Sequence, residues 1–163
     1  MIKILFICHG NICRSPLAEF YFKDLVSKHN LSAGFHIESA ATSYEEIGNP
    51  VHSGTRKKLA EAGISCAGKT ARHMEKADYR EFDYLIGMDQ ANIRNMMRIV
   101  GGDPQQKIYK MLEFAGDGWK DLKAGKRNMD KAPDVADPWY TGNFEDTWRD
   151  VTAGCEGLLN FLR

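Results

Sequence analysis

The sequence has no hydrophobic run that approaches the roughly 20 residues a helix needs to cross a bilayer. Its first residues, Met1-Ile2-Lys3, lead into a strand-like segment rather than the apolar core of a signal peptide. Charge of one sign is not in excess either, because 22 Lys and Arg face 22 Asp and Glu. We therefore expect a cytoplasmic protein with no membrane span and no nucleic-acid partner.

Cysteine is scarce and irregularly spaced, at positions 8, 13, 66 and 155. A chain of 163 residues buries enough apolar surface to need no disulfide staples, so we expect reduced thiols. No Cys-x2-Cys pair accompanies a set of histidines, which argues against a zinc site. We expect neither a metal nor another cofactor.

Repeats, low-complexity segments and linkers are absent, so we expect one α/β domain over residues 1–163. Residues 2–7 are apolar on both faces, which is typical of a central parallel strand. Periodicity and turn residues predict further strands at 35–40, 84–88 and 108–112, and helices at 16–29, 53–62, 74–81, 90–100 and 144–162. Strands that alternate with helices predict right-handed crossovers and a doubly wound sheet.

The expected sheet brings the candidate functional residues to one edge. Ligands of such sheets bind beyond the carboxyl ends of the strands, where the strand order reverses. Residues 8–15 follow the first strand, Asp89 follows the third, and a polar loop at 115–140 follows the fourth. We expect no regular element within 115–136. Ser15 and Asp89 also suit the caps of the helices that follow them.

Residues 8–15 read Cys-His-Gly-Asn-Ile-Cys-Arg-Ser, between the first strand and a helix N-terminus. Backbone N–H groups and the positive helix end favour an anion, and the same field favours a thiolate at Cys8. Gly10 and Asn11 tolerate the positive φ that turns N–H groups inward. Arg14 lies where a bidentate clamp on phosphate belongs. The rest of this site for phosphate or a similar oxyanion is His9, Ile12, Cys13 and Ser15.

The stretch Cys8-x5-Arg14-Ser15-Pro16 resembles the phosphate loop of the low-molecular-weight protein tyrosine phosphatase family. Further segments match that family in order and approximate spacing: Ser39-Ala40-Ala41-Thr42-Ser43, Ile47-Gly48-Asn49-Pro50, Ala71-Arg72, Met88-Asp89 and Asp137-Pro138-Trp139-Tyr140. The resemblance implies a single three-layer domain with a four-stranded parallel sheet, and phosphotyrosine proteins as substrates.

The resemblance also implies a two-step reaction. Cys8 would attack phosphorus in line and form a phosphocysteine, while Arg14 and the loop N–H groups hold the equatorial oxygens. Asp137 would protonate the phenolate leaving group and then act as the base for hydrolysis. The Ser15 hydroxyl would hydrogen-bond the Cys8 sulfur, and Pro138 would restrict the backbone that carries the acid.

In the resembled family, side chains behind the loop hold it open, and Asn11, Ser15 and Ser39 match that network. Relatives often have a histidine two residues before the Ala-Arg pair, where this chain has Lys69. Asp89 resembles a carboxylate near the rear of the loop, and a plain helix cap explains it equally well.

Trp139 and Tyr140 resemble the aromatic wall of the substrate cleft, where a ring would flank the phenyl group of the substrate. Either ring could instead anchor the loop to the core. Relatives carry an aromatic residue on the opposite wall, whereas this chain has Tyr44-Glu45-Glu46-Ile47. Tyr44 could fill that wall from a shifted position, or Glu45 and Glu46 could disfavour acidic phosphopeptides.

The three cysteines other than Cys8 are expected to protect the nucleophile or to pack in the core. In the resembled family, the cysteine at position 13 forms a reversible disulfide with the nucleophile and protects it from irreversible oxidation, although a structural role is also open. Cys66 and Cys155 are expected to be structural, since Cys155 falls on the apolar stripe of the last helix. A monomer is the expected state.

Four other functions are alternatives to phosphotyrosine hydrolysis on a similar fold or loop. Arsenate reductase needs a downstream cysteine pair, and none lies between Cys66 and Cys155. Protein-arginine phosphatase has a threonine at the place of Ile12, so Ile12 and the aromatic residues after the acid favour phosphotyrosine. A non-hydrolytic phospho-carrier lacks the loop arginine and the Asp-Pro acid, and a phosphotyrosine-binding module would not need Cys8 together with both Arg14 and Asp137.

Overall fold

The sheet at the centre of the computed structural model, which describes residues 1–163, has four parallel strands. These are β1 (Ile2–Cys8), β2 (Phe35–Ala41), β3 (Tyr84–Gly87) and β4 (Ile108–Lys110), in the order β2-β1-β3-β4. Leu5 of β1 lies opposite Glu38 on one side and Leu85 on the other. The strand order therefore reverses at β1, which confirms the predicted doubly wound sheet.

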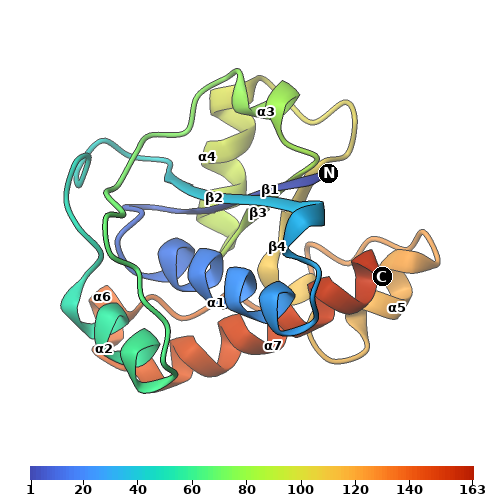
Figure 1. The fold of residues 1–163 in the computed structure, drawn as a ribbon. Helices are drawn as coiled ribbons and strands as arrows, with labels where there is room; N and C mark the ends of the chain where they lie inside the picture. The colour runs from blue at the N-terminus through green and yellow to red at the C-terminus, as the bar shows by residue number, and fades with distance from the viewer.

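Helices cover both faces of this sheet. Figure 1 shows α1 (Arg14–Lys28) and α7 (Phe144–Leu162) below it, and α3 (Asp78–Glu81) and α4 (Gln90–Val100) above it. Three further helices are α2 (Ser53–Glu61), α5 (Gly118–Lys123) and α6 (Pro138–Thr141). Short 3-10 turns at Ser32–Gly34 and Met111–Glu113 precede β2 and follow β4. None of the helices has the length and apolar character that crossing a membrane requires.

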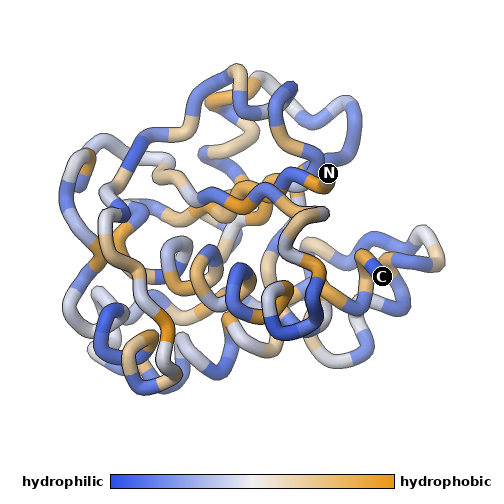
Figure 2. The backbone as a smooth tube through the Cα atoms, in the orientation of Figure 1, coloured by the Kyte–Doolittle hydropathy of each residue, from blue (hydrophilic) through white to orange (hydrophobic).

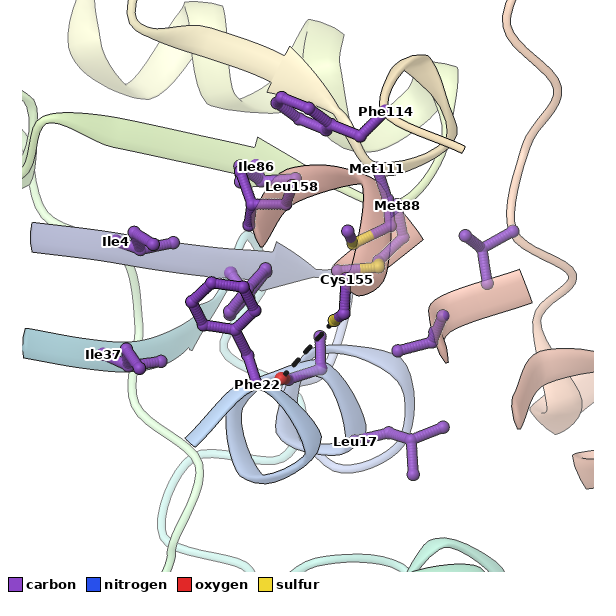
Figure 3. Close-up of a cluster of buried hydrophobic side chains, with 14 of the residues drawn as sticks. Ile4, Leu17, Phe22, Ile37, Ile86, Met88, Met111, Phe114, Cys155 and Leu158 are labelled. Atoms are coloured by element: carbon purple, nitrogen blue, oxygen red, sulfur yellow. Dashed lines mark hydrogen bonds between the residues drawn. The ribbon is translucent and has the colours of Figure 1, made fainter. Parts of the chain in front are cut away.

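Two apolar clusters fix these layers on the sheet. One joins β1 and β3 to α1 and α7, and Figure 3 shows Phe22, Met111 and Leu158 within it. The other joins the opposite side of β1 and β3 to α4, through residues such as Leu5, Leu85 and Ile93. In Figure 2 hydrophobic residues accordingly recur along the central strands. Burial of these apolar surfaces is the main force that holds the strand ends in place.

Cys155 is part of the first cluster. Its side chain is fully buried, and its Sγ lies 3.9 Å from the carbonyl oxygen of Ala18 on α1. Desolvation raises the pKa of this thiol, so it stays neutral at physiological pH. The expected structural role of Cys155 fits this position.

Several element boundaries differ from the prediction. Helix α1 begins at Arg14 rather than Pro16, and Ser15 makes no capping bond because its hydroxyl faces Cys8. Helix α3 begins at Asp78, not at residue 74, because Arg72 and Met74 hydrogen-bond to the backbone of Ala41, the last residue of β2. Helix α5 was not expected, since it is short and buries only Leu122.

Candidate active site

The site lies at the carboxyl ends of β1 and β3, where the strand order reverses. Residues 8–14 lead from β1 into α1, Asp89 follows β3, and Asp137 begins α6 after β4. A cavity of about 270 Å³ opens there. Its lining contains most of the predicted residues and two glutamates: Cys8, His9, Gly10, Ile12, Cys13, Arg14, Glu45, Glu46, Asp137, Trp139 and Tyr140.

Cys8 lies at the base of this cavity with two hydrogen-bond donors directed at its sulfur. The backbone N–H of Asn11 is 3.3 Å from Sγ, and the Ser15 Oγ is 3.0 Å away. Asn11 adopts a φ of 59°, the left-handed conformation that turns its N–H inward. Cys8 is only 3% exposed, so groups of the protein rather than water must stabilise negative charge on its sulfur.

Asn11 also connects the loop to the protein interior. Its Nδ2 donates to Ser15 Oγ at 2.8 Å and to Ser39 Oγ at 2.9 Å. Its Oδ1 accepts a hydrogen bond from the backbone N–H of Arg72 at 3.1 Å. Because Ser15 Oγ accepts from Asn11, the hydroxyl proton of Ser15 is free to point at the Cys8 sulfur. The structure thus brings together the three residues expected to support the loop.

An ion pair at the buried carboxylate of Glu19 extends this network. Ser39 Oγ donates to Glu19 Oε1 at 2.5 Å, and Glu19 is 4% exposed. Lys69 Nζ lies 3.4 Å from the same oxygen and donates to the Ser39 carbonyl at 2.9 Å. Desolvation lowers the pKa of Lys69, and the nearby Glu19 carboxylate opposes this shift. Lys69 therefore belongs to the network that supports the loop.

Sequence reasoning missed Glu19. The available signal was its spacing, because Ser15 and Glu19 are four residues apart and share one face of α1. That face packs on the sheet, where an isolated carboxylate would be unfavourable without partners. Lys23, with its Nζ 2.5 Å from Glu19 Oε2, supplies a second cation.

Arg14 is held between carboxylates from two other elements. Its side chain is 2% exposed, and Nη1 lies 2.7 Å from Asp89 Oδ2. The same nitrogen donates to the Val135 carbonyl at 3.1 Å, while Nη2 lies 3.3 Å from Asp137 Oδ2. Burial opposes the charge of the Arg14 guanidinium, but Cys8 and the two carboxylates outweigh that effect and raise its pKa. The cation is thus fixed beside the sulfur.

Asp89 both caps a helix and places a carboxylate behind the loop. Its Oδ1 accepts a hydrogen bond from the backbone N–H of Asn92 at 2.7 Å and so caps α4. Its Oδ2 contacts Arg14. One carboxylate therefore orients the guanidinium and begins the helix after β3.

Asp137 is the N-cap of α6 and faces the cavity. Its Oδ1 accepts from the backbone N–H of Trp139 at 3.1 Å, and Pro138 occupies the first turn of the helix. The His52 ring supports this short helix. Its centroid lies 6.1 Å from that of Trp139, in an edge contact, and 5.3 Å from that of Phe144, on which it stacks. The carboxylate is 23% exposed, so it can exchange a proton with a group in the cavity.

The two walls of the cavity are chemically unlike. Trp139 and Tyr140 form one rim and are 62% and 85% exposed. Tyr44 is not part of the lining, and its ring stacks on that of His73 with the ring centroids 3.8 Å apart. Glu45 and Glu46 do line the cavity, and Glu45 Oε2 is 3.1 Å from His9 Nε2. Tyr44 therefore lies outside the lining of this cavity, and its part in the substrate cleft stays a prediction.

Cys13 is a buried thiol in the wall of the cavity. Desolvation, then the proximity of Cys8 and Asp137, raises its pKa to about 12. Cys13 is therefore a neutral thiol at physiological pH, and both loop cysteines are free. Cys8, in contrast, has the Asn11 N–H and the Ser15 hydroxyl beside its sulfur.

Fold and site together define a doubly wound α/β protein whose first strand leads into a Cys-x5-Arg loop. The family model described as low molecular weight phosphotyrosine protein phosphatase matches residues 3–163. The low molecular weight protein-tyrosine-phosphatase YfkJ of Bacillus subtilis is 41% identical over 159 residues, which are 98% of this chain and 94% of that protein. This chain belongs to the low molecular weight phosphotyrosine protein phosphatase family.

Solved structures agree with this assignment. The crystal structure of YfkJ from Bacillus subtilis has a TM-score of 0.86 at 39% identity, over 98% of this chain and 93% of that one. SP-PTP, a low molecular weight protein tyrosine phosphatase from Streptococcus pyogenes, has a TM-score of 0.81 at 38% identity. The match covers 100% of this chain and 94% of that one. A Drosophila arginine phosphatase shares the fold, with a TM-score of 0.79 at 24% identity. That match covers 99% of this chain and 98% of the other.

Proposed function

We propose that this chain hydrolyses phosphotyrosine in proteins through a phosphocysteine intermediate. The observation that carries the proposal is the meeting of Cys8, Arg14 and Asp137 in one cavity. They supply a nucleophile, a clamp for the equatorial phosphate oxygens and a proton donor. Family membership supports the same reaction.

In the first step, the Cys8 thiolate forms a bond to phosphorus while the bond from phosphorus to the phenolic oxygen breaks. Arg14 and the N–H groups of residues 9–14 hold the three equatorial oxygens as negative charge redistributes. Asp137 gives its proton to the departing phenolate, so that tyrosine leaves as a neutral phenol. Asp137 is then a carboxylate.

In the second step, this carboxylate takes a proton from water, whose oxygen forms a bond to phosphorus as the sulfur–phosphorus bond breaks. Inorganic phosphate and the thiolate are the products. The Ser15 hydroxyl, 3.0 Å from Sγ, donates to the sulfur as its charge returns and so makes it a better leaving group. Asp137 ends the cycle protonated.

The shape of the cavity supports phosphotyrosine over shorter phosphoamino acids. Cys8 is 3% exposed at the base, whereas the rings of Trp139 and Tyr140 stand at the rim. A phenyl ring spans that depth and offers its faces to the aromatic rim, which a serine side chain cannot do. Ile12 adds an apolar side chain to the wall, which favours an aryl group over a guanidinium.

We propose that the protein acts in the cytoplasm, as the sequence also suggests. The four cysteines are free and buried, which suits a reducing compartment such as the cytoplasm. One phosphatase domain occupies the chain, and we propose that it acts as a monomer on phosphoproteins and binds free phosphate as its product.

Turnover of p-nitrophenyl phosphate by the purified protein in chelator tests this proposal. We expect p-nitrophenolate release without added metal, and we expect Cys8→Ser to lower kcat by at least about a thousandfold because the nucleophile is lost. Wild-type turnover by Cys8→Ser would contradict the mechanism. Phosphotyrosine, phosphoserine and phosphoarginine peptides test the substrate class, and a preference for phosphoarginine would contradict the argument from Ile12.

A further inference from the structure

Lys110, the last residue of β4, is the only lysine in the buried part of the protein. Its side chain is 4% exposed and does not line the cavity. Its Nζ donates to the Ala132 carbonyl at 2.7 Å and lies 2.6 Å from Asp134 Oδ1. A buried ammonium group is costly unless it is paired, so these two contacts account for its presence.

Both partners of Lys110 belong to the segment that leads to Asp137. Residues 124–137 contain no helix or strand, so hydrogen bonds with neighbouring elements must set their path. Asp134 Oδ1 also accepts from the backbone N–H of Gln90 at 3.0 Å, at the start of α4. The Lys110 ammonium and this N–H lower the pKa of Asp134, although burial alone would raise it. Asp134 is therefore a charged anchor at physiological pH.

The residues directly after Asp134 are fastened as well. The Val135 N–H donates to the Met88 carbonyl at 2.9 Å, and the Val135 carbonyl accepts from Arg14. Thr147 Oγ1 of α7 donates to the Ala136 carbonyl at 2.9 Å. The fastened segment ends one residue before Asp137. A change at Lys110 can therefore displace the carboxylate without touching the cavity.

We propose that Lys110 and Asp134 are positioning residues that hold the Asp137 carboxylate at the place where it protonates the leaving group. This inference rests on the proposed role of Asp137 as general acid. Displacement of a catalytic group by about 1 Å can cost on the order of a hundredfold in rate. An anchor in an otherwise irregular segment thus has a direct effect on proton transfer.

The dependence of kcat/KM on the leaving group tests this proposal. Phenyl phosphate needs the acid, because the pKa of phenol is about 10, whereas 4-nitrophenol is far more acidic and leaves with little help. We define R as kcat/KM for 4-nitrophenyl phosphate divided by kcat/KM for phenyl phosphate. The fraction of folded enzyme cancels in R, so loss of stability alone does not change it.

We expect Lys110→Met to raise R by about tenfold, since a displaced acid penalises the poorer leaving group. Asp134→Ala, at a half-exposed position, is expected to raise R as well, whereas Asp134→Asn, which keeps an acceptor oxygen, raises it less. Asp137→Asn should raise R most. In the Asp137→Asn background, Lys110→Met should leave R unchanged, because no acid remains to be displaced.

Lys107→Met is the matched control. Lys107 lies just before β4, and its Nζ donates to the Tyr79 carbonyl at 2.6 Å, away from the cavity. We expect R to keep its wild-type value in this variant. If R rises in Asp137→Asn but not in Lys110→Met or Asp134→Ala, the positioning role is wrong and the acid role stands. If R does not rise in Asp137→Asn, the proposed role of Asp137 itself is wrong.

Discussion

Asn11 shows how much of this site depends on single side chains. Its left-handed backbone turns one N–H toward Cys8, and its amide bridges Ser15 and Ser39. An aspartate could adopt the same φ but would have no Nδ2 donors for the two hydroxyls. The donors aimed at the sulfur thus depend on this amide.

The acidic side of the cavity leads to a prediction on substrate charge. Glu45 and Glu46 line it, and His9 and Arg14 are the only basic residues there. We expect kcat/KM to be higher for phosphotyrosine peptides with neighbouring lysines than for matched peptides with neighbouring glutamates. Exposed charge pairs contribute about 0.2 to 1 kcal/mol each, so the preference should be a few-fold and should shrink at high salt.

Steady-state kinetics with the two peptides measures this preference. The double variant Glu45→Gln, Glu46→Gln should reduce the ratio of the two kcat/KM values toward one. Glu81→Gln is the control, because Glu81 is exposed at the end of α3 outside the cavity. A preference for the acidic peptide in the wild-type protein would refute this electrostatic account.

The sequence alone predicts those site residues whose partners are close to them in the chain. Cys8, Arg14 and Ser15 occur in one loop, so their spacing indicated an oxyanion site from the sequence alone. Glu19 and Lys110 were not identified, because the partners that reveal their roles, Ser39 and Ala132, are 20 and 22 residues away in the chain. The position of the Tyr44 ring could not be predicted, because its stacking partner, His73, lies on another loop.

At the scale of elements, the strands and long helices follow from their apolar patterns. Strand β1 is apolar throughout its buried part, and α4 ends at Gly101 in a left-handed conformation. The short elements α5 and α6 bury one residue each, so they have no periodic signal. The start of α3 was missed because pairing with Ala41, a contact far apart in sequence, replaced local helix formation.

The packing of α7 on the 3-10 turn after β4 depends on a glycine. A Cβ atom at Gly157 would lie 1.8 Å from the carbonyl oxygen of Phe114, far inside the van der Waals distance. We expect Gly157→Ala to lower the free energy of unfolding by about 1 to 3 kcal/mol, because the backbone must move to relieve the overlap. Urea unfolding followed by circular dichroism measures the change.

Gly34→Ala is the matched control for this prediction. A Cβ atom there would meet no other atom within 4 Å, and Gly34 does not have a positive φ. Its unfolding midpoint should stay near that of the wild-type protein. A midpoint for Gly157→Ala equal to that of Gly34→Ala would show that α7 can shift at no cost, contrary to the close packing described here.

At the scale of the whole molecule, the sheet brings the reacting groups together from distant parts of the chain. Cys8 follows β1, Asp89 follows β3, and Asp137 lies beyond β4 on a segment fastened to α4, α7 and the loop. The alternation of strands and helices was enough to predict that these ends meet at one edge. The path of residues 124–137 was not predictable, since tertiary hydrogen bonds determine it.

The central claim is that Cys8 carries the phosphoryl group during turnover. Rapid mixing of the Asp137→Ala variant with 4-nitrophenyl phosphate, followed by quenching, tryptic digestion and mass spectrometry, tests it directly. The 4-nitrophenolate group leaves with little help from an acid, whereas loss of the base slows hydrolysis of the intermediate. We predict a phosphoryl group on Cys8 in the peptide of residues 4–14, and none after Cys8→Ser. Release of 4-nitrophenolate by the enzyme with no covalent phosphate on Cys8 at any time would contradict the account.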